Sequence, residues 1–375
     1  MFNKIFEYIK RKRQIKRSFH RHTQYMCAGI YEYDDSIKYI WRNDPYTKQR
    51  ADQIFQNNYH QLSIKTLVFI LRKTLFRNKF IVPYMGLYKN GFCGTVYRPV
   101  RSTQGYSDSK IFDLFSNQVL SVFYEEKHFL TVLEQYENFN NYFPMPAILC
   151  VDYEKKMIIE ELVQFKQNHS WQEDDYLYLM FDIFNRYIDY FEQCIEKRIS
   201  SFITAEDLLI TTGSANETQD IFNKISPQII GAKFPYLPLH GDLWTANTLL
   251  AKGEESNIYY IDWEYSMEYI FFYDFFHLMW LEVYVNNNYL YIDKYVKGDF
   301  DLYFKRIFSQ FNLKFQDEFR LDYFYIYFLN FFKERLAHLD RIDQMDYLSK
   351  YKILLGKVQC VPQVIANKQY INMDM

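Results

Sequence analysis

Between residues 81 and 163 the apolar positions come in short runs that are separated by turn residues. Runs of this kind, rich in β-branched and aromatic residues, are typical of strands. The segments that predict strands are 82–98, which holds a glycine turn at its centre, then 110–115 after a polar turn over 102–109, and finally 143–151 and 156–163. Over 119–136 the apolar residues recur at helical spacing instead. The predicted order is therefore strand, strand, strand, helix, strand, strand.

From about residue 171 onward the pattern is mainly helical, apart from a short stretch over 235–263. A small strand-rich region followed by a larger helical region predicts an α+β fold with two lobes. We expect a β-rich, nucleotide-binding N-lobe over 81–163 and a helical C-lobe over 164–375, which carries the catalytic loop and the acceptor site. Residues 1–80 are expected to form a basic, mostly helical extension, with a helix over 61–80.

The extension begins with an amphipathic pattern. Phe2, Ile5, Phe6 and Ile9 share one helical face, and a basic cluster over 11–17 follows them. One interpretation is a helix that lies at an anionic membrane surface through residues 1–18. The other is a solvated, charged helix that packs on the body of the protein through its apolar stripe.

Aromatic residues are unusually frequent, with 36 Tyr and 35 Phe, whereas the chain has only 11 Gly and 9 Pro. This composition predicts long helices with a thick aromatic core. A codon bias toward Phe, Tyr, Ile, Asn and Lys is the alternative explanation of the same counts.

Charge and cysteine content narrow the class of protein. A net charge of −2 argues against a protein that coats nucleic acid. The 5 cysteines lie far apart without a CxxC pair, which argues against a zinc or redox motif and against a full disulfide framework. We therefore expect a reducing, cytoplasmic location. No run of about 18 apolar residues predicts a transmembrane helix.

The clearest chemistry lies in the segment 237–250, where apolar flanks enclose His-Gly-Asp-Leu-Trp-Thr-Ala-Asn. It places a carboxylate at Asp242 and an amide at Asn247, and a short apolar strand then delivers a second carboxylate at Asp262. Phosphoryl transfer needs one carboxylate to orient and deprotonate the acceptor hydroxyl. It also needs oxygen ligands for the Mg²⁺ ions that bridge the phosphates. These three residues supply those groups in a suitable order.

The loop resembles the catalytic loop of the aminoglycoside phosphotransferase and choline kinase superfamily, which reads HGDxxxxN and is followed by IDxE. Its form HGDLWTAN is also close to the HGDLWSGN of fructosamine kinases. The resemblance spans roughly residues 81–280 and implies a protein-kinase-like fold that uses ATP and Mg²⁺. It implies that Asp242 is the catalytic base and that Asn247 and Asp262 are magnesium ligands.

The same resemblance assigns supporting roles around the loop. His240 and Gly241 would shape it, and Asp274, within a Tyr-Asp pair on an aromatic helix, matches the acidic residue that braces the loop in this family. Glu264 matches a residue that follows the metal ligand in choline-kinase-like members.

The nucleotide side is predicted from glycines and from the end of a strand. Gly91 and Gly94 lie between two predicted strands, where the resemblance implies a phosphate-binding loop, and an ordinary hairpin is the alternative. Glu161, in the pair with Glu160, is expected at a hinge whose backbone would bind adenine.

The resemblance also implies a lysine on the third strand, paired with a glutamate of the next helix. Glu126 fits the helix position, and Glu125 is the alternative. Near Asp113, where the lysine is implied, the sequence has none, so Lys110 at the start of that strand is the predicted substitute. A solvated lysine at the strand edge is the other interpretation of Lys110.

The predicted function is an ATP- and Mg²⁺-dependent transfer of phosphate to a hydroxyl of a small molecule. A sugar or surface-glycan precursor is favoured as acceptor, because the basic N-terminus is compatible with the inner face of a membrane. A pseudokinase or interaction protein of the same fold is one alternative, and an aminoglycoside-type antibiotic phosphotransferase is another. A protein kinase is disfavoured, since the loop reads HGD and no APE motif follows Asp262.

Overall fold

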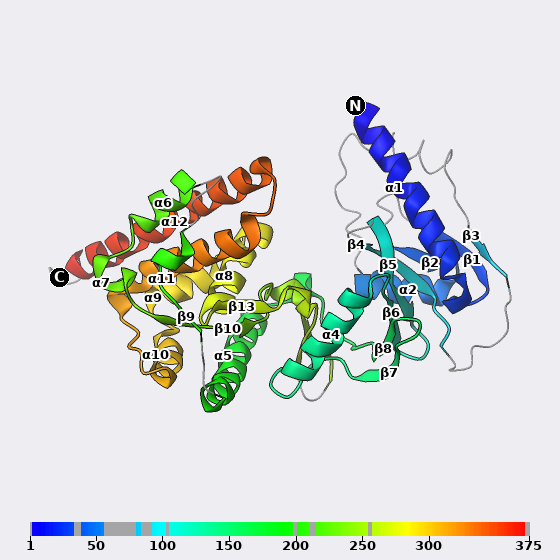
Figure 1. The fold of residues 1–375 in the computed structure, drawn as a ribbon, viewed down its shortest axis with the longest axis horizontal. Coiled ribbons are helices and arrows are strands. Elements are labelled where there is room, and N and C mark those ends of the chain that lie inside the picture. The colour runs from blue at the N-terminus through cyan, green and yellow to red at the C-terminus, as the bar shows by residue number, and fades with distance from the viewer. Residues whose placement is uncertain are drawn as a thin grey trace. The chain divides into compact units, whose positions relative to one another are not determined.

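The computed structural model describes residues 2–33, 39–55, 80–83, 92–102, 105–197, 201–209, 215–253 and 257–371. The chain divides into two compact units (Figure 1). Unit 1 contains residues 1–137, 145–167 and 250–257, and unit 2 contains residues 138–144, 168–249 and 258–375. A strand-rich unit and a mainly helical unit form the α+β plan that the sequence predicted.

Unit 1 is built on one sheet of 8 strands whose neighbours run antiparallel. Across the sheet the strands are β3 (Phe80–Val82), β1 (Gly29–Tyr33), β2 (Ile40–Arg42), β4 (Val96–Ser102), β5 (Gly105–Asp113), β6 (Gln118–Val122), β8 (Met157–Glu161) and β7 (Ile148–Asp152). Its helices are α1 (Phe2–Arg21), α2 (Pro45–Phe55) and α4 (Glu126–Phe139). The last two strands match the predicted segments 143–151 and 156–163.

The first 80 residues do not form a separate, mostly helical extension. β1 pairs with both β2 and β3, and β2 pairs with β4, so this region supplies three strands to the common sheet. The predicted helix over 61–80 lies outside the described residues, except for Phe80, which begins β3. The strand propensity of Gly29–Tyr33 was missed because a five-residue strand carries little periodicity.

The predicted helix over 119–136 was wrong at its start. Residues Gln118–Val122 form β6, and the helix α4 begins only at Glu126. A short apolar run fits either period, and here the pairing of β6 with β5 and β8 decides for the strand. Because β6 is the strand that precedes the helix, the segment that contains Lys110 belongs to the strand before it, β5, which begins at Gly105 rather than at residue 110.

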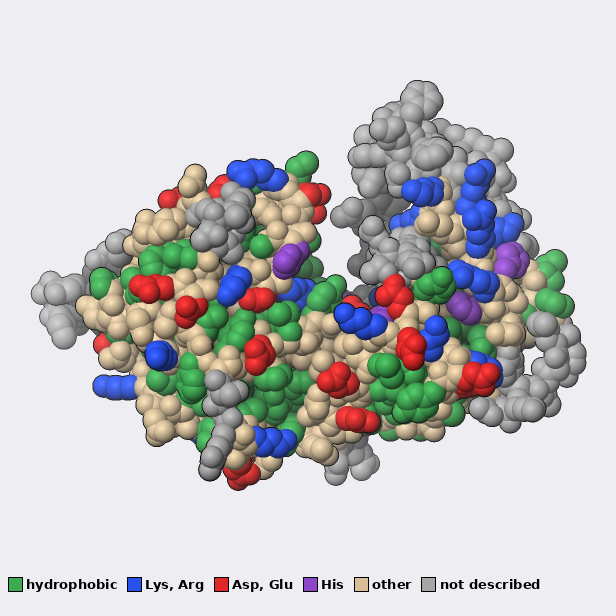
Figure 2. Space-filling model, viewed as in Figure 1, with side chains coloured by type: hydrophobic (Ala, Val, Ile, Leu, Met, Phe, Trp, Pro, Cys, Tyr) green, Lys and Arg blue, Asp and Glu red, His purple; other side chains and the backbone are tan. Residues whose placement is uncertain are grey.

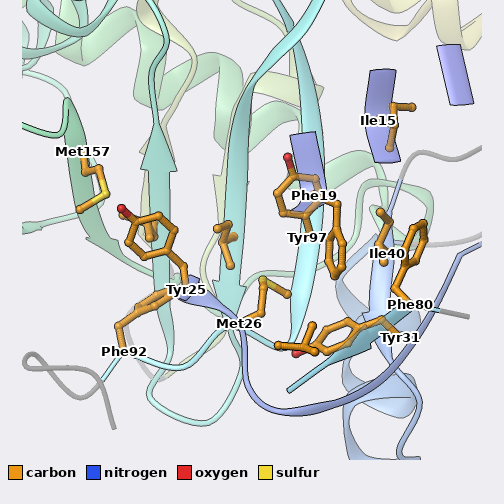
Figure 3. Close-up of a cluster of buried hydrophobic side chains, with 13 residues drawn as sticks. Ile15, Phe19, Tyr25, Met26, Tyr31, Ile40, Phe80, Phe92, Tyr97 and Met157 are labelled. Atoms are coloured by element: carbon orange, nitrogen blue, oxygen red, sulfur yellow. The ribbon is translucent and has the colours of Figure 1, made fainter. Parts of the chain in front are cut away.

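Helix α1 packs on one face of the sheet. Ile15 and Phe19 are fully buried, in a cluster with Tyr97 of β4 and Tyr31 of β1 (Figure 3). The Ser18 hydroxyl is 2.7 Å from the Tyr97 hydroxyl. The second half of α1 is therefore packed against the sheet through Ile15 and Phe19. The side chains of residues 2–9, which carry the predicted apolar stripe, lie outside what the structure describes.

The opposite face of the sheet carries a second apolar cluster. Its buried members are Ala51 of α2 with Val96, Phe112, Leu114, Val119 and Leu162. The two clusters arise because successive strand residues point to opposite faces, so Val96 and Phe112 lie on one side while Tyr97 and Ile111 lie on the other.

Unit 2 is mainly helical. Its helices are α5 (Glu173–Glu196), α6 (Ala215–Phe222), α7 (Pro227–Ile230), α8 (Tyr273–Asn286), α9 (Leu290–Lys297), α10 (Asp301–Gln310), α11 (Arg320–Phe331) and α12 (Arg341–Ile371), and a π-helical turn, η7 (Phe332–Leu336), follows α11. Residues 273–283 of α8 are all buried. A helix that is surrounded by protein in this way carries mostly apolar residues on all of its faces. Stacked rings such as Phe184 and Phe275, 4.8 Å apart, make the aromatic core that the composition predicted.

Short strands flank the loop over residues 240–247 in unit 2. β13 (Met267–Ile270), β10 (Phe234–Leu239) and β9 (Phe202–Ile203) form a three-stranded sheet in that order, and β11 (Thr248–Leu250) pairs with β12 (Ile258–Tyr260). β10 pairs antiparallel with β13, with Leu239 opposite Met267, and the backbone N–H of the next residue, His240, donates to Asp274 near the start of α8.

A disulfide and the hydropathy of the helices complete the description of the fold. Cys27 and Cys93 form a disulfide, with Cα atoms 5.0 Å apart, which the sequence did not indicate because the two cysteines are 66 residues apart. Among the described helices, none has both the length and the apolar character needed to cross a membrane.

Candidate active site

The motif loop begins where β10 ends and turns sharply at Gly241. This glycine has a φ of +75°, and a Cβ atom there would lie 2.5 Å from the Tyr265 carbonyl oxygen. A left-handed backbone and this close approach both require glycine. The chain then continues through Asp242 to a short 3₁₀ turn, η4 (Thr245–Asn247), and into β11.

Asn247 is fixed by two hydrogen bonds to Asp242. Its Nδ2 group donates to the Asp242 carbonyl oxygen at 2.7 Å and to the carboxylate Oδ2 at 2.9 Å. Since the amide nitrogen faces Asp242, the amide oxygen faces the other way. The loop therefore presents a carboxylate and an amide oxygen from one rigid turn.

Asp262 is tied to the same loop through its neighbour Ile261. The Ile261 N–H donates to the Asn247 carbonyl at 3.0 Å, and His240 Nε2 is 3.0 Å from the Ile261 carbonyl. Asp262 itself has a left-handed backbone, with φ 60° and ψ 53°. For a residue other than glycine this conformation costs about 1–3 kcal/mol, and such strain is typical of functional positions.

His240 acts as a neutral connector. The Asp242 N–H donates to its Nδ1 at 3.3 Å, so the proton of the ring lies on Nε2, which donates to the Ile261 carbonyl. Burial lowers the pKa of His240 to about 4, which keeps the ring neutral near pH 7. One buried imidazole thus joins the turn at Asp242 to the segment that carries Asp262.

The donor set of Asn247 and Asp262 fits Mg²⁺. In the part of the chain that the structure describes, no group of 3 or more His, Cys, Asp or Glu side chains is arranged to hold a metal. Mg²⁺ does not need such a group, because it prefers oxygen ligands, keeps several waters and takes phosphate oxygens from a substrate. One amide oxygen and one carboxylate are therefore a suitable protein contribution.

Asp274, the second residue of α8, contacts the backbone of the loop at His240 and Gly241. Its Oδ2 accepts the His240 N–H at 2.9 Å, its Oδ1 accepts the Gly241 N–H at 3.0 Å, and the Tyr187 hydroxyl also donates to Oδ2. Burial raises the pKa of Asp274 to about 7, although the hydrogen bonds from Tyr187 and the two backbone groups oppose that rise.

Replacing Asp274 with asparagine is expected to destabilise unit 2 by about 1–3 kcal/mol, because an amide NH₂ would face one of the two backbone donors. Tyr187→Phe removes one donor and leaves both acceptors, so it should cost only about 1 kcal/mol. Chemical denaturation of the two variants beside the parent protein measures both values. Equal stability of Asp274→Asn and the parent would show that the carboxylate does not hold the loop.

Two further residues, Arg335 and His277, lie next to Asp242, and the sequence did not predict either contact. Arg335, in the π-helical turn η7, donates from Nη1 to the Gly241 carbonyl at 2.7 Å and from Nη2 to Asp242 Oδ1 at 3.3 Å. Its guanidinium also lies 3.8 Å from the centre of the Tyr265 ring. His277 Nε2 is 3.5 Å from the same Asp242 oxygen, and the His277 Nδ1 is 2.9 Å from the Tyr327 hydroxyl.

These partners control the charge of Asp242. Burial by itself raises the pKa of this carboxyl, but the nearby His277 ring and the charge of Arg335 outweigh it, and the net shift is downward. Asp242 is therefore ionised near pH 7, as a proton acceptor must be.

Replacing Arg335 with methionine is expected to raise the pKa of Asp242, since the methionine removes the adjacent positive charge. The acid limb of the pH dependence of kcat/KM should then move to higher pH, whereas Arg335→Lys, which keeps the charge, should move it less. Arg341→Met, at an arginine that contacts Glu217 instead, is the matched control. An acid limb that is unchanged in Arg335→Met would contradict this account of the charge.

On the nucleotide side, Lys110, the predicted substitute for the implied lysine near Asp113, lies on β5. The strand before α4 is β6, and Lys110 of β5 pairs in register with Ser121 of β6. Directly opposite residues of an antiparallel pair point to the same face. Glu126 is the first residue of α4.

Of the two glycines predicted for a phosphate loop, Gly94 is buried, and a Cβ atom there would lie 2.3 Å from Ile111 Cγ2 and 2.9 Å from the Tyr25 carbonyl. Gly94 exchanges backbone hydrogen bonds with Tyr25 and Cys27, so the structure gives it a packing role inside unit 1. Gly91 lies outside the described residues.

Glu161 ends β8, where the sequence predicted a hinge. Its N–H donates to the Ala147 carbonyl at 3.0 Å, and the Leu162 N–H donates to the Asn117 carbonyl at 2.8 Å. The backbone at this point is therefore anchored within unit 1.

No protein-family model matches the chain, and a search of curated proteins finds no match either. Solved structures that are similar to it include an amicoumacin kinase in complex with AMP-PNP, Ca²⁺ and its antibiotic (8% identity, 79% of this chain and 94% of that chain, TM-score 0.41). Another is the GDP complex of aminoglycoside 2'-phosphotransferase-IIIa (10% identity, 80% and 100%, TM-score 0.42). A third is the choline kinase LicA from Streptococcus pneumoniae (11% identity, 70% and 93%, TM-score 0.36).

Proposed function

We propose that this protein transfers the γ-phosphate of ATP to a hydroxyl of a small molecule in a Mg²⁺-dependent reaction. The observation that carries the proposal is the coupling of three groups. The side chain of Asn247 is bonded to Asp242, and its backbone is bonded to the residue before Asp262. Hydrogen bonds thus fix the carboxylate base and the two oxygen ligands relative to one another.

In this proposal Asp242 orients the acceptor hydroxyl and accepts its proton. The depressed pKa of Asp242 keeps the carboxylate available at neutral pH. Asn247 and Asp262 would hold Mg²⁺, which neutralises charge on the phosphates when it is bound. His240 and Asp274 keep the loop in shape, because they fix the backbone on both sides of Gly241.

Lys110 is proposed as the lysine that contacts the phosphates. Lys110 of β5 lies directly across from Ser121 of β6, the strand before α4, and on the same face of the sheet. The Lys110 side chain is long enough to cover the spacing of about 5 Å between such cross-strand neighbours. Glu126, at the start of the next helix, is the proposed partner of this lysine, and the backbone near Glu161 is the proposed site for the base.

The absence of a lysine near Asp113 also favours a second candidate, a pseudokinase that binds nucleotide or a partner without catalysis. The retained set of Asp242, Asn247 and Asp262 supports catalysis instead. A thermal shift with Mg²⁺ and ATP, followed by a phosphate-transfer assay on sugars and amino alcohols, separates the two. Nucleotide binding without transfer to any acceptor would favour the pseudokinase.

For the acceptor we propose a sugar or a surface-glycan precursor, with the protein at the inner face of a membrane. The support is the basic surface of α1, where Lys10, Arg13, Lys16 and Arg17 are exposed (Figure 2). Anionic lipid attracts such a surface by about 1 kcal/mol for each charge. An aminoglycoside as acceptor is the alternative.

Reversing the charge of Arg13, Lys16 and Arg17 to glutamate is expected to abolish cosedimentation with vesicles that contain phosphatidylglycerol. The change leaves the buried Ile15 and Phe19 in place, so the fold of unit 1 should persist. A variant that partitions onto these vesicles as well as the parent would rule out membrane binding through α1.

A further inference from the structure

Helix α2 is a well-formed element with its own start signal. Asp44 caps it: the Thr47 N–H donates to Asp44 Oδ1 at 2.9 Å, and the Thr47 hydroxyl donates to Oδ2 at 2.8 Å. Pro45 occupies the first helical position, where its missing N–H costs nothing. Residues at the start of α2 are therefore sufficient to explain where the helix begins, whereas its position on unit 1 depends on contacts with the sheet.

The position of α2 is set by a row of apolar residues across the sheet. Val96 pairs with Phe112, Phe112 pairs with Val119, and Val119 pairs with Glu160, so these residues form one continuous row over four strands. Ala51 of α2 is buried against this row, and Ile54 packs beside it. Leu162, just after β8, belongs to the same cluster.

Three polar contacts hold α2 at the same place. The Tyr46 hydroxyl donates to the Leu114 carbonyl at 3.3 Å, and Arg50 Nη2 donates to Asn117 Oδ1 at 2.9 Å. At the other end of the helix, Gln167 Nε2 donates to the Ile54 carbonyl at 3.1 Å. These contacts join α2 to the turn before β6 and to the segment that follows β8.

The covered row is the surface that a nucleotide would need. The row next to it contains Lys110 and Ser121, which lie on the same face as Val119, because residues two apart on a strand point the same way. A nucleotide with its phosphates at Lys110 and its base at the backbone of 160–162 must cross Val119. Ala51 of α2 belongs to the same buried cluster as Val119.

We propose that α2 is an intramolecular cover of the nucleotide-binding face, and that ATP binds only when α2 has left it. This inference rests on the proposed function, since it concerns the same nucleotide site. The apparent affinity for ATP is then the intrinsic affinity reduced by the fraction of molecules in which α2 is displaced. A ligand or partner that holds α2 away would switch the protein on.

The test compares two glutamates placed two residues apart on α2. Ala51→Glu puts a carboxylate into the apolar cluster and should displace the helix, whereas Gln49→Glu adds the same charge on its exposed side. Isothermal titration calorimetry with Mg²⁺ and AMP-PNP is the readout. We expect Ala51→Glu to bind at least about tenfold more tightly than the parent, and Gln49→Glu to bind like the parent.

Hydrogen exchange on the unmodified protein gives an independent measurement. Adding saturating Mg²⁺ and AMP-PNP should speed amide exchange over residues 45–55. Asp44→Ala removes the cap of α2 together with the ion pair between Asp44 and Arg42. It should shift the affinity in the same direction as Ala51→Glu, and it replaces that variant if Ala51→Glu does not fold.

The outcomes separate this inference from the proposed function. If parent and variants bind AMP-PNP equally, and α2 exchange is unchanged or slowed, then α2 is not a cover, while the proposed function stands. If neither the parent nor any folded variant binds AMP-PNP, the nucleotide site itself is wrong, and the inference falls with it.

Discussion

Asp242→Asn is expected to lower the rate of phosphate transfer by about 100-fold or more, because it removes the group that accepts the proton of the hydroxyl. The asparagine keeps the size of the side chain and one oxygen. The contacts to Asn247, His277 and Arg335 leave Asp242 on a supported turn, so the variant should fold and should still bind nucleotide. Single-turnover kinetics on the best acceptor measures the chemical step.

Asp293→Asn is the matched control, since Asp293 is an exposed carboxylate of unit 2 on α9. Its turnover and thermal midpoint should equal those of the parent. If Asp242→Asn retains turnover within a few-fold of the parent, Asp242 is not the base.

Exchanging the lysine between two strands should have the second largest effect. Lys110→Met is expected to weaken transfer by about 100-fold, the scale of losing one charged group that stabilises the transition state. The double variant Lys110→Met with Ser121→Lys returns the charge to the directly opposite position on the same face. It should therefore recover most of the lost activity.

Ser121→Lys alone is the control, because it shows whether the buried serine position tolerates a lysine. Rescue by the double variant would show that one positive charge at this point of the sheet is what matters. Full activity of Lys110→Met would assign Lys110 to the solvated strand edge, which was the other interpretation of its position.

The sequence was most informative where chemistry and local structure coincide. The turn from His240 to Asn247 is defined by short-range features, chiefly the positive φ at Gly241 and the bond between Asn247 and Asp242. Such features depend on residues a few positions apart, so a sequence pattern can express them. The two-lobe plan was also predictable, because helical and strand periods occupy different parts of the chain.

Long-range contacts were not predictable in the same way. Arg335 reaches Gly241 and Asp242 from a turn more than 90 residues later, and no motif marks it. His277 was visible on an aromatic helix, but its contact with Asp242 depends on how α8 packs. Likewise β1 and β2 became strands through their pairing partners, and the assignment of β6 decided which strand holds Lys110.

The central claim is that this protein moves a phosphate with the help of Asp242 and a metal held by Asn247 and Asp262. The most direct measurement is the transfer of labelled γ-phosphate from ATP to a panel of sugars and amino alcohols, with Mg²⁺ and with EDTA. The transfer should be measured for the parent protein, for Asp262→Asn, and for Ala51→Glu, in which α2 is expected to leave the nucleotide-binding face. We predict a labelled acceptor only with Mg²⁺, and strongly reduced labelling in Asp262→Asn. Label that stays on ATP for every acceptor while the nucleotide binds, or transfer that is equal in EDTA, would contradict the account.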